Sequence, residues 1–168
     1  EERIGGDIHV IEGKGDDVHR YFEKNDSERM STQFSLTHRF NDSLSLTFSN
    51  SFNRFDRLLE TPGYTFSGLQ KSAFSEVNIV RFRERTEWIA GVNLWTDHFA
   101  EKPADNRTLR DYRQNTFGAF VQNSLTFSEE WMLESGLRGD YVQDYGFAFL
   151  PRLALLYRPG TRFSSRIG

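Results

Sequence analysis

Four charged side chains could provide acid–base chemistry, because paired carboxylates beside an arginine can exchange protons with a substrate. They are Glu76, Glu134, Arg138 and Asp140. The competing interpretation is that these side chains line a wet interior. We favour the second interpretation, since no nucleophile–base pair and no metal motif in the sequence supports an enzyme.

A second group combines aromatic rings with one arginine, in or beside stretches that we expect to be loops. Its members are Tyr21, Phe22, Tyr64, Phe66, Arg110, Tyr112 and Tyr145. Aromatic rings and a guanidinium together suit an aromatic, anionic ligand. The same aromatic rings could instead anchor the loops to the rest of the fold. Ligand contact is therefore a hypothesis for each of these residues.

The histidines and the acidic pairs give no metal motif. His9, His19 and His98 are scattered along the chain and lack the close spacing of a metal site. Asp16-Asp17 and Asp26-Ser27-Glu28 could suggest calcium, but the spacing of an EF-hand loop is absent. We therefore expect no metal site and no cofactor.

The elements that must position these groups are strands. From Ser43 to Phe52 every odd position is a hydroxyl residue, and nearly every even position is Leu or Phe. A strand points successive side chains to opposite faces, so this segment has one apolar and one polar face. The pattern recurs along the chain without a helical period between its copies, which predicts about nine strands. The weakest of them is the first, near Ile4 to Glu12.

The turn at residues 41–43 predicts the register of the second strand, Met30 to Phe40, with the third. It sets Phe40 opposite Leu44, His38 opposite Leu46 and Leu36 opposite Phe48. His38 and the nearby hydroxyls could suggest a membrane-embedded lipase. However, this register places Leu46, not a serine, opposite His38, and we favour a role in an interfacial aromatic belt.

A loop at Ser128-Glu129-Glu130 predicts the register of the sixth and seventh strands. The expected pairs are Phe127–Trp131, Leu125–Leu133, Val121–Leu137, Ala119–Gly139 and Phe117–Tyr141. Glu134, Arg138 and Asp140 then share the opposite face. Aromatic rings at both ends of an apolar wall are typical of a barrel that crosses a membrane. Asn123 opposite Ser135 counts against this interpretation unless the two side chains bond each other.

The fourth strand, Lys71 to Phe82, has an ambiguous face. We predict that Ala73, Val77 and Ile79 point outward while Glu76 and Asn78 point inward; Phe74, Val80 and Phe82 support the opposite choice. In the fifth strand the outward residues are expected to be Trp88, Ala90, Val92 and Leu94.

The expected connections alternate in length. Short turns fall near 41–43, 83–85, 128–130 and 159–160, and longer loops near 13–29, 57–70 and 100–115. A short tip at 143–146 is the exception. Outer-membrane barrels alternate short periplasmic turns with long external loops.

Composition narrows the class further. The 168 residues include no cysteine, carry a net charge of -3, and are 37% hydrophobic and 15% aromatic. No apolar run approaches the roughly 20 residues of a membrane helix, and nothing suggests nucleic-acid binding. The predicted fold class is all-β: an antiparallel up-and-down meander forming an open curved sheet, part of a large transmembrane β-barrel.

Several runs resemble strands of TonB-dependent outer-membrane receptors, in particular siderophore and vitamin receptors of the Bacteroidetes type. The runs are WIAGVNLW (88–95), FGAFVQN (117–123), ESGLRGDY (134–141), FLPR (149–152) and SRIG (165–168). The resemblance covers most of the chain and is strongest from about Glu76 onward. It depends on the order and spacing of the runs rather than on any single motif.

The resemblance implies a receptor, not an enzyme, in the outer membrane of a Gram-negative bacterium. It would import a ferric siderophore or a cobalamin-like ligand with energy from TonB. Outer-membrane lipid and the receptor's own plug domain would be further partners, with Glu76, Glu134, Arg138 and Asp140 facing the plug.

The ends of the chain favour an interior piece of such a barrel. The sequence begins with Glu1 and stops within what we interpret as a strand, so the plug and the segment that contacts TonB would precede it. About nine strands cannot close a barrel of roughly 22 strands. We therefore expect residues 1–168 to be part of the barrel domain. Two alternatives stay open: a passive porin or adhesin barrel, and a soluble antiparallel sheet such as a carbohydrate-binding sandwich.

Overall fold

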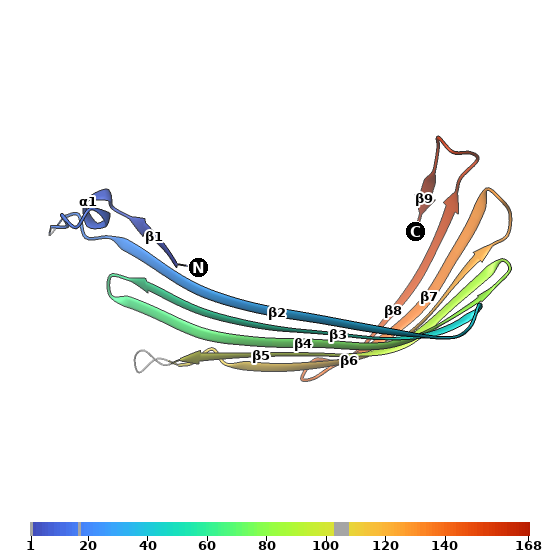
Figure 1. The fold of residues 1–168 in the computed structure, drawn as a ribbon, viewed down its shortest axis with the longest axis horizontal. Coiled ribbons are helices and arrows are strands. Elements are labelled where there is room, and N and C mark those ends of the chain that lie inside the picture. Colours follow the sequence, from blue (N-terminus) through green and yellow to red (C-terminus); the bar gives the residue numbers. More distant parts are fainter. Residues whose placement is uncertain (1, 17, 103–107) are drawn as a thin grey trace. The chain divides into compact units, whose positions relative to one another are not determined.

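The described part of the chain forms one open sheet in which strands follow one another in sequence order (Figure 1). The computed structural model describes residues 2–16, 18–102 and 108–168. The nine strands are β1 (Glu2–Gly6), β2 (Phe22–Asn41), β3 (Leu44–Thr61), β4 (Tyr64–Arg83), β5 (Thr86–Lys102), β6 (Tyr112–Thr126), β7 (Trp131–Val142), β8 (Gly146–Tyr157) and β9 (Ser165–Ile167). The all-β antiparallel meander is confirmed.

The region of the expected first strand is only partly extended. β1 ends at Gly6, and the helix α1 follows over Ile8–Ile11. The Asp7 side chain caps α1 by accepting a hydrogen bond from the His9 N–H at 3.0 Å. A short apolar run does not by itself distinguish strand from helix, and a capping aspartate favours the helix. The prediction of a strand from Ile4 to Glu12 is therefore wrong after Gly6. Within the described residues no helix is long and apolar enough to span a membrane.

Three connections are shorter than the sequence predicted. β2 begins at Phe22 rather than Met30, and the expected loop at 57–70 is a two-residue turn between Thr61 and Tyr64. Gly63 has a φ of 75°, which a tight turn needs and a residue without a Cβ adopts freely. The expected loop at 100–115 also shrinks, since β5 reaches Lys102 and β6 starts at Tyr112.

The predicted alternation of loop lengths is consequently wrong. The β3–β4 turn is as short as the β2–β3 turn, so the two sides of the sheet are not sorted by loop length. Polar residues stand at both odd and even positions of these strand ends, so the sequence pattern there resembled a loop. In the structure several of those polar residues pair across neighbouring strands, such as Arg57 with Asn25 at 2.9 Å and Gln70 with Asp97 at 3.0 Å.

The chain divides into two compact units. Unit 1 comprises residues 1–32, 52–73 and 97–113, and unit 2 comprises residues 33–51, 74–96 and 114–168. β1 and α1 belong to unit 1, β7 to β9 belong to unit 2, and β2 to β6 contribute to both.

In unit 2 both predicted registers are confirmed. β6 pairs with β7 through Phe117–Tyr141, Ala119–Gly139, Val121–Leu137, Asn123–Ser135 and Leu125–Leu133. The rings of Phe127 and Trp131 stack with their centroids 6.4 Å apart. Between β2 and β3, the hydroxyl oxygens of Thr37 and Thr47 lie 3.0 Å apart, as the predicted register requires.

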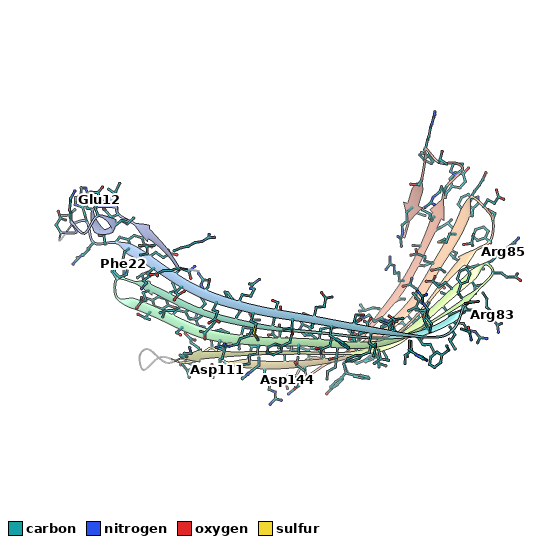
Figure 2. All side chains as sticks on the ribbon, in the orientation of Figure 1. Glu12, Phe22, Arg83, Arg85, Asp111 and Asp144 are labelled. Carbon is teal, nitrogen blue, oxygen red and sulfur yellow. The ribbon has the colours of Figure 1, made fainter. Side chains whose placement is uncertain are left out.

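Exposure alternates with a period of two over residues 76–81 of β4. In β4 the predicted outward residues Val77 and Ile79 are 38% and 41% exposed, although Phe82 is exposed too. Glu76 and Asn78 are half-buried and share a hydrogen bond of 3.0 Å. Within the described ranges, Ala154 is the single apolar side chain that is buried. The sheet therefore has no core of its own, and its side chains project from both faces (Figure 2).

Candidate functional site

Four of the seven predicted ligand residues come together in unit 1. Tyr64 and Phe66 lie at the start of β4, Tyr112 is the first residue of β6, and Arg110 lies just before it. The strand between them, β5, adds three residues that the sequence analysis missed: Asp97, Phe99 and Glu101. We call these seven residues together with Gln70 the ligand platform.

An aromatic ladder forms the middle of the platform. The Phe66 and Phe99 rings are stacked with centroids 6.2 Å apart and planes inclined by 17°. Phe99 and Tyr112 follow at 5.7 Å and 26°. Gly68 of β4 allows this arrangement, because a Cβ there would lie 2.6 Å from the Phe99 ring.

Arg110 is held in place at one end of the ladder. Its Nε and Nη2 donate to the two oxygens of Glu101 at 3.0 and 2.8 Å, and Nη2 also donates to the Tyr64 hydroxyl at 3.2 Å. The guanidinium carbon lies 5.1 Å from the centre of the Phe66 ring. The hydrogen bonds to Glu101 and then Tyr64 raise the pKa of Arg110 above its ordinary value. The guanidinium is therefore charged and oriented, yet its side chain is 62% exposed.

Asp97 fixes the other end of the ladder. Its carboxylate accepts hydrogen bonds from Gln70 Nε2 at 3.0 and 3.1 Å and from the Tyr112 hydroxyl at 3.1 Å. Gln70 also donates to the Tyr112 hydroxyl at 3.2 Å. Two strands, β4 and β5, therefore hold the hydroxyl of Tyr112, and the face of its ring stacks on Phe99. Such a pre-ordered platform can take a planar aromatic group beside an exposed guanidinium.

The other three predicted ligand residues lie elsewhere. Tyr21 precedes β2, and Phe22 pairs with Gly6 of β1. Tyr145 lies in unit 2, on the β7–β8 turn, and is 83% exposed. Asp144 and Gly146 on either side of it have positive φ angles of 68° and 92°. Within the described residues, neither Tyr21, Phe22 nor Tyr145 makes a ring contact or side-chain hydrogen bond with the platform.

The four predicted charged residues all lie in unit 2; Glu76 accepts a hydrogen bond from Asn78, and the other three form two groups. Arg138 Nε donates to both oxygens of Asp140 at 3.0 and 2.9 Å, and Arg138 Nη2 approaches Asn93 Oδ1 at 3.4 Å. Glu134 pairs with Arg166 and, at 3.7 Å, with Arg152. Pairing of this kind fits a polar lining.

Gly118 of β6 brings the first group together. A Cβ at this position would lie 2.4 Å from Asp140 Oδ1 and 2.7 Å from Asn93 Oδ1. Asn93 is only 3% exposed, and its Nδ2 has no hydrogen-bond partner within the described residues. Close by in the sheet, an open hollow of about 490 Å³ is lined by Glu76, Phe120, Gln122, Gly136, Arg138 and Arg152, among others.

Asn123, the polar residue on the apolar wall, is not bonded to Ser135. Its Nδ2 donates instead to the carbonyl oxygen of Glu87 on β5 at 3.2 Å. The neighbouring strand therefore satisfies a polar group that the sequence alone could not place.

The structure brings two of the histidines together. His9 and His19 are far apart in the sequence for a metal motif, but their ring centroids lie 4.6 Å apart. Asp16 contacts the Nδ1 atom of His19 at 3.1 Å. No set of three or more His, Cys, Asp or Glu side chains converges as ligands within the described residues.

Comparison with known proteins places the chain in a family. The family model described as "TonB dependent receptor-like, beta-barrel" matches residues 7–167. Among solved structures, a mutant of the ferric enterobactin receptor from Pseudomonas aeruginosa is similar, with 13% identity and a TM-score of 0.34. The match covers 86% of this chain and 32% of that receptor. A comparison with curated protein sequences finds no match. Because the family model covers nearly all residues, the chain belongs to the β-barrel family of TonB-dependent receptors.

Proposed function

We propose that this chain is part of the barrel wall of an outer-membrane receptor for TonB-energised uptake of a scarce ligand. The ligand proposed is a ferric siderophore or a similar chelate, with a cobalamin-like compound as the runner-up. Membership of the receptor family supports uptake rather than catalysis. The proposed location is the outer membrane of a Gram-negative bacterium, with residues 1–168 lying in the barrel domain.

The ligand platform is the observation that carries this proposal. It offers stacked rings and an oriented, exposed guanidinium, both of which an aromatic, anionic chelate would use. Glu101 already compensates part of the charge of Arg110, so the rings should supply more of the affinity than the charge does. Tyr21, Phe22 and Tyr145 remain candidates for contacts from outside the platform.

Unit 2 supports a barrel wall between lipid and a plug domain. Its exposed apolar residues would face lipid, and Glu76, Glu134, Arg138 and Asp140 would face the receptor's own plug. The hydrogen bonds and ion pairs of these four charged residues form within the chain itself, without lipid or a plug. A plug would, however, cover the hollow beside Arg138.

The test is binding and uptake with the full receptor that contains this chain. Ferric catecholate, hydroxamate and citrate chelates would be titrated against the purified receptor by intrinsic fluorescence. We expect Phe99→Ala and Tyr112→Ala each to weaken binding about tenfold, since an aromatic contact contributes roughly 0.5–1.5 kcal/mol beyond area burial. Phe163→Ala is the matched control, because Phe163 is exposed and lies in unit 2.

Uptake by cells separates active import from a passive barrel. Active import requires that accumulation of the bound chelate stops when TonB is removed. If accumulation continues without TonB, the chain is part of a passive porin. If no chelate binds and the platform variants behave like the wild type, the platform has no part in recognition.

A further inference from the structure

The connection between β1 and β2 contains a pair of imidazoles that neither the uptake function nor the ligand platform uses. His9 lies in α1, and His19 lies in the segment that leads to β2. Their ring centroids are 4.6 Å apart, with the planes inclined by 51°. Two tilted rings at this distance can direct a nitrogen each toward a common point.

Asp16 determines which nitrogen of His19 is available. Its Oδ1 accepts hydrogen bonds from the backbone N–H groups of Val18 and His19 at 2.8 and 2.7 Å, and it lies 3.1 Å from His19 Nδ1. A carboxylate can only accept, so Nδ1 carries the proton and Nε2 is the nitrogen left for a metal. A carboxylate that holds a histidine by one nitrogen commonly orients the other nitrogen toward a metal.

The backbone holds this loop against α1. A Cβ on Gly15 would lie 3.3 Å from Val10 Cγ2 and 3.2 Å from the carbonyl oxygen of His19. The backbone N–H of Lys14 donates to the carbonyl oxygen of His9. The ring pair is therefore positioned by several local contacts, not by the two side chains alone.

The distance between the rings fits chelation of a single ion. With metal–nitrogen bonds of about 2.0–2.1 Å, two imidazoles bound side by side have ring centres roughly 4.5–5.2 Å apart, the shorter value for a right-angled arrangement. The observed 4.6 Å lies near the right-angled limit, which Cu²⁺ and Ni²⁺ prefer over Zn²⁺. Since no third side chain converges within the described residues, water would complete the coordination.

We propose that His9 and His19 form a two-imidazole binding site for a divalent transition metal, tightest for Cu²⁺, with Asp16 as a positioning residue. The site is separate from the chelated iron of the proposed uptake function. Its existence does not depend on whether the receptor imports a siderophore.

The experiment titrates Cu²⁺ alone into the full receptor, folded in detergent micelles, in a buffer without metal ligands. Calorimetry gives the affinity, and electron paramagnetic resonance detects nitrogen coordination. We expect one equivalent bound through two nitrogens, and His9→Ala or His19→Ala should each weaken it tenfold or more. Ni²⁺ and Zn²⁺ should bind more weakly than Cu²⁺.

Three further variants make the result specific. Asp16→Asn should weaken Cu²⁺ binding about 10–100-fold while leaving two-nitrogen coordination in the spectrum. His38→Ala and His98→Ala are matched controls and should bind like the wild type. Near-ultraviolet circular dichroism checks that every variant is folded. If a folded His9→Ala or His19→Ala variant binds Cu²⁺ as tightly as the wild type, the proposal is wrong, whatever the outcome of the siderophore assays.

Discussion

Unit 1 and unit 2 share the strands β2 to β6, yet they satisfy their side chains in different ways. Unit 2 exposes large apolar residues at alternating positions, such as Trp88, Phe117 and Leu137. The strand segments of unit 1 instead form polar pairs: Asp56 bonds to Arg54 at 3.3 Å and to Lys102 at 3.4 Å. One strand can therefore carry two kinds of surface along its length.

The difference suggests that the two parts of the same strands lie in two different environments. A membrane-crossing strand needs about 9–11 residues, whereas β2 to β5 have 17 to 20. The apolar parts in unit 2 suit lipid, and the polar parts in unit 1 suit water. We therefore expect the bilayer to surround unit 2 and the ligand platform to stand outside it.

The largest expected effect comes from placing a charge on the apolar surface of unit 2. Leu137→Arg should destabilise the folded receptor in a bilayer by about 2–4 kcal/mol, because arginine is costly near the middle of the membrane. The matched change in unit 1, Leu109→Arg, should cost only about 0–1 kcal/mol. Leu137 and Leu109 are 50% and 41% exposed, so burial in the protein does not explain a difference.

Reversible unfolding by guanidinium chloride in lipid vesicles measures both variants. Equal losses of unfolding free energy for Leu137→Arg and Leu109→Arg would contradict the division of surroundings between the two units.

A smaller effect is expected from filling the space above Gly118. Gly118→Ala should lower the unfolding free energy by about 1–3 kcal/mol, because its Cβ would push Asp140 and Asn93 apart and strain the Arg138 pair. Gly136→Ala is the matched control, since the nearest atom to its Cβ would be 3.4 Å away. The same unfolding assay compares them, and an equal response of both glycines would remove the special role of Gly118.

The smallest effect is expected in unit 1. Asp56→Asn removes the ion pairs with Arg54 and Lys102, and the expected loss of unfolding free energy is about 0–1 kcal/mol because these pairs reach solvent. The loss should shrink further at high salt. Unfolding curves at low and high ionic strength measure it. A large loss that salt does not change would mean that Asp56 is shielded from water.

The sequence was sufficient for the register of β6 with β7 and of β2 with β3 in unit 2. The alternation in β6 and β7 predicted pairs such as Val121–Leu137, because a one-residue slip would reverse every side chain. It was insufficient for strand ends in unit 1. There β3 runs on to Thr61 and β4 starts at Tyr64, within the segment 57–70 that was expected to be a loop.

The ligand platform, too, could be predicted only in part from the sequence. Asp97, Phe99 and Glu101 alternate on one face of β5, a signal that could have directed attention to them. The expected loop at 100–115 separated Glu101 from Asp97 and Phe99. Nothing local identifies Tyr64 as a partner of Arg110, which lies 46 residues away in the sequence.

By itself, therefore, the sequence determined the all-β class, the period of two and the short-range register, since these depend on neighbouring residues and turns. The tertiary structure decided which distant side chains meet: Arg110 with Glu101 and Tyr64, and Arg138 with Asn93. The physical reason is that alternation fixes the face of the sheet on which a side chain lies. It does not fix how far along the strand that side chain lies relative to the neighbouring strands. This position depends on where each strand begins and ends. The hydrogen bonds between strands determine it only when the strands pair.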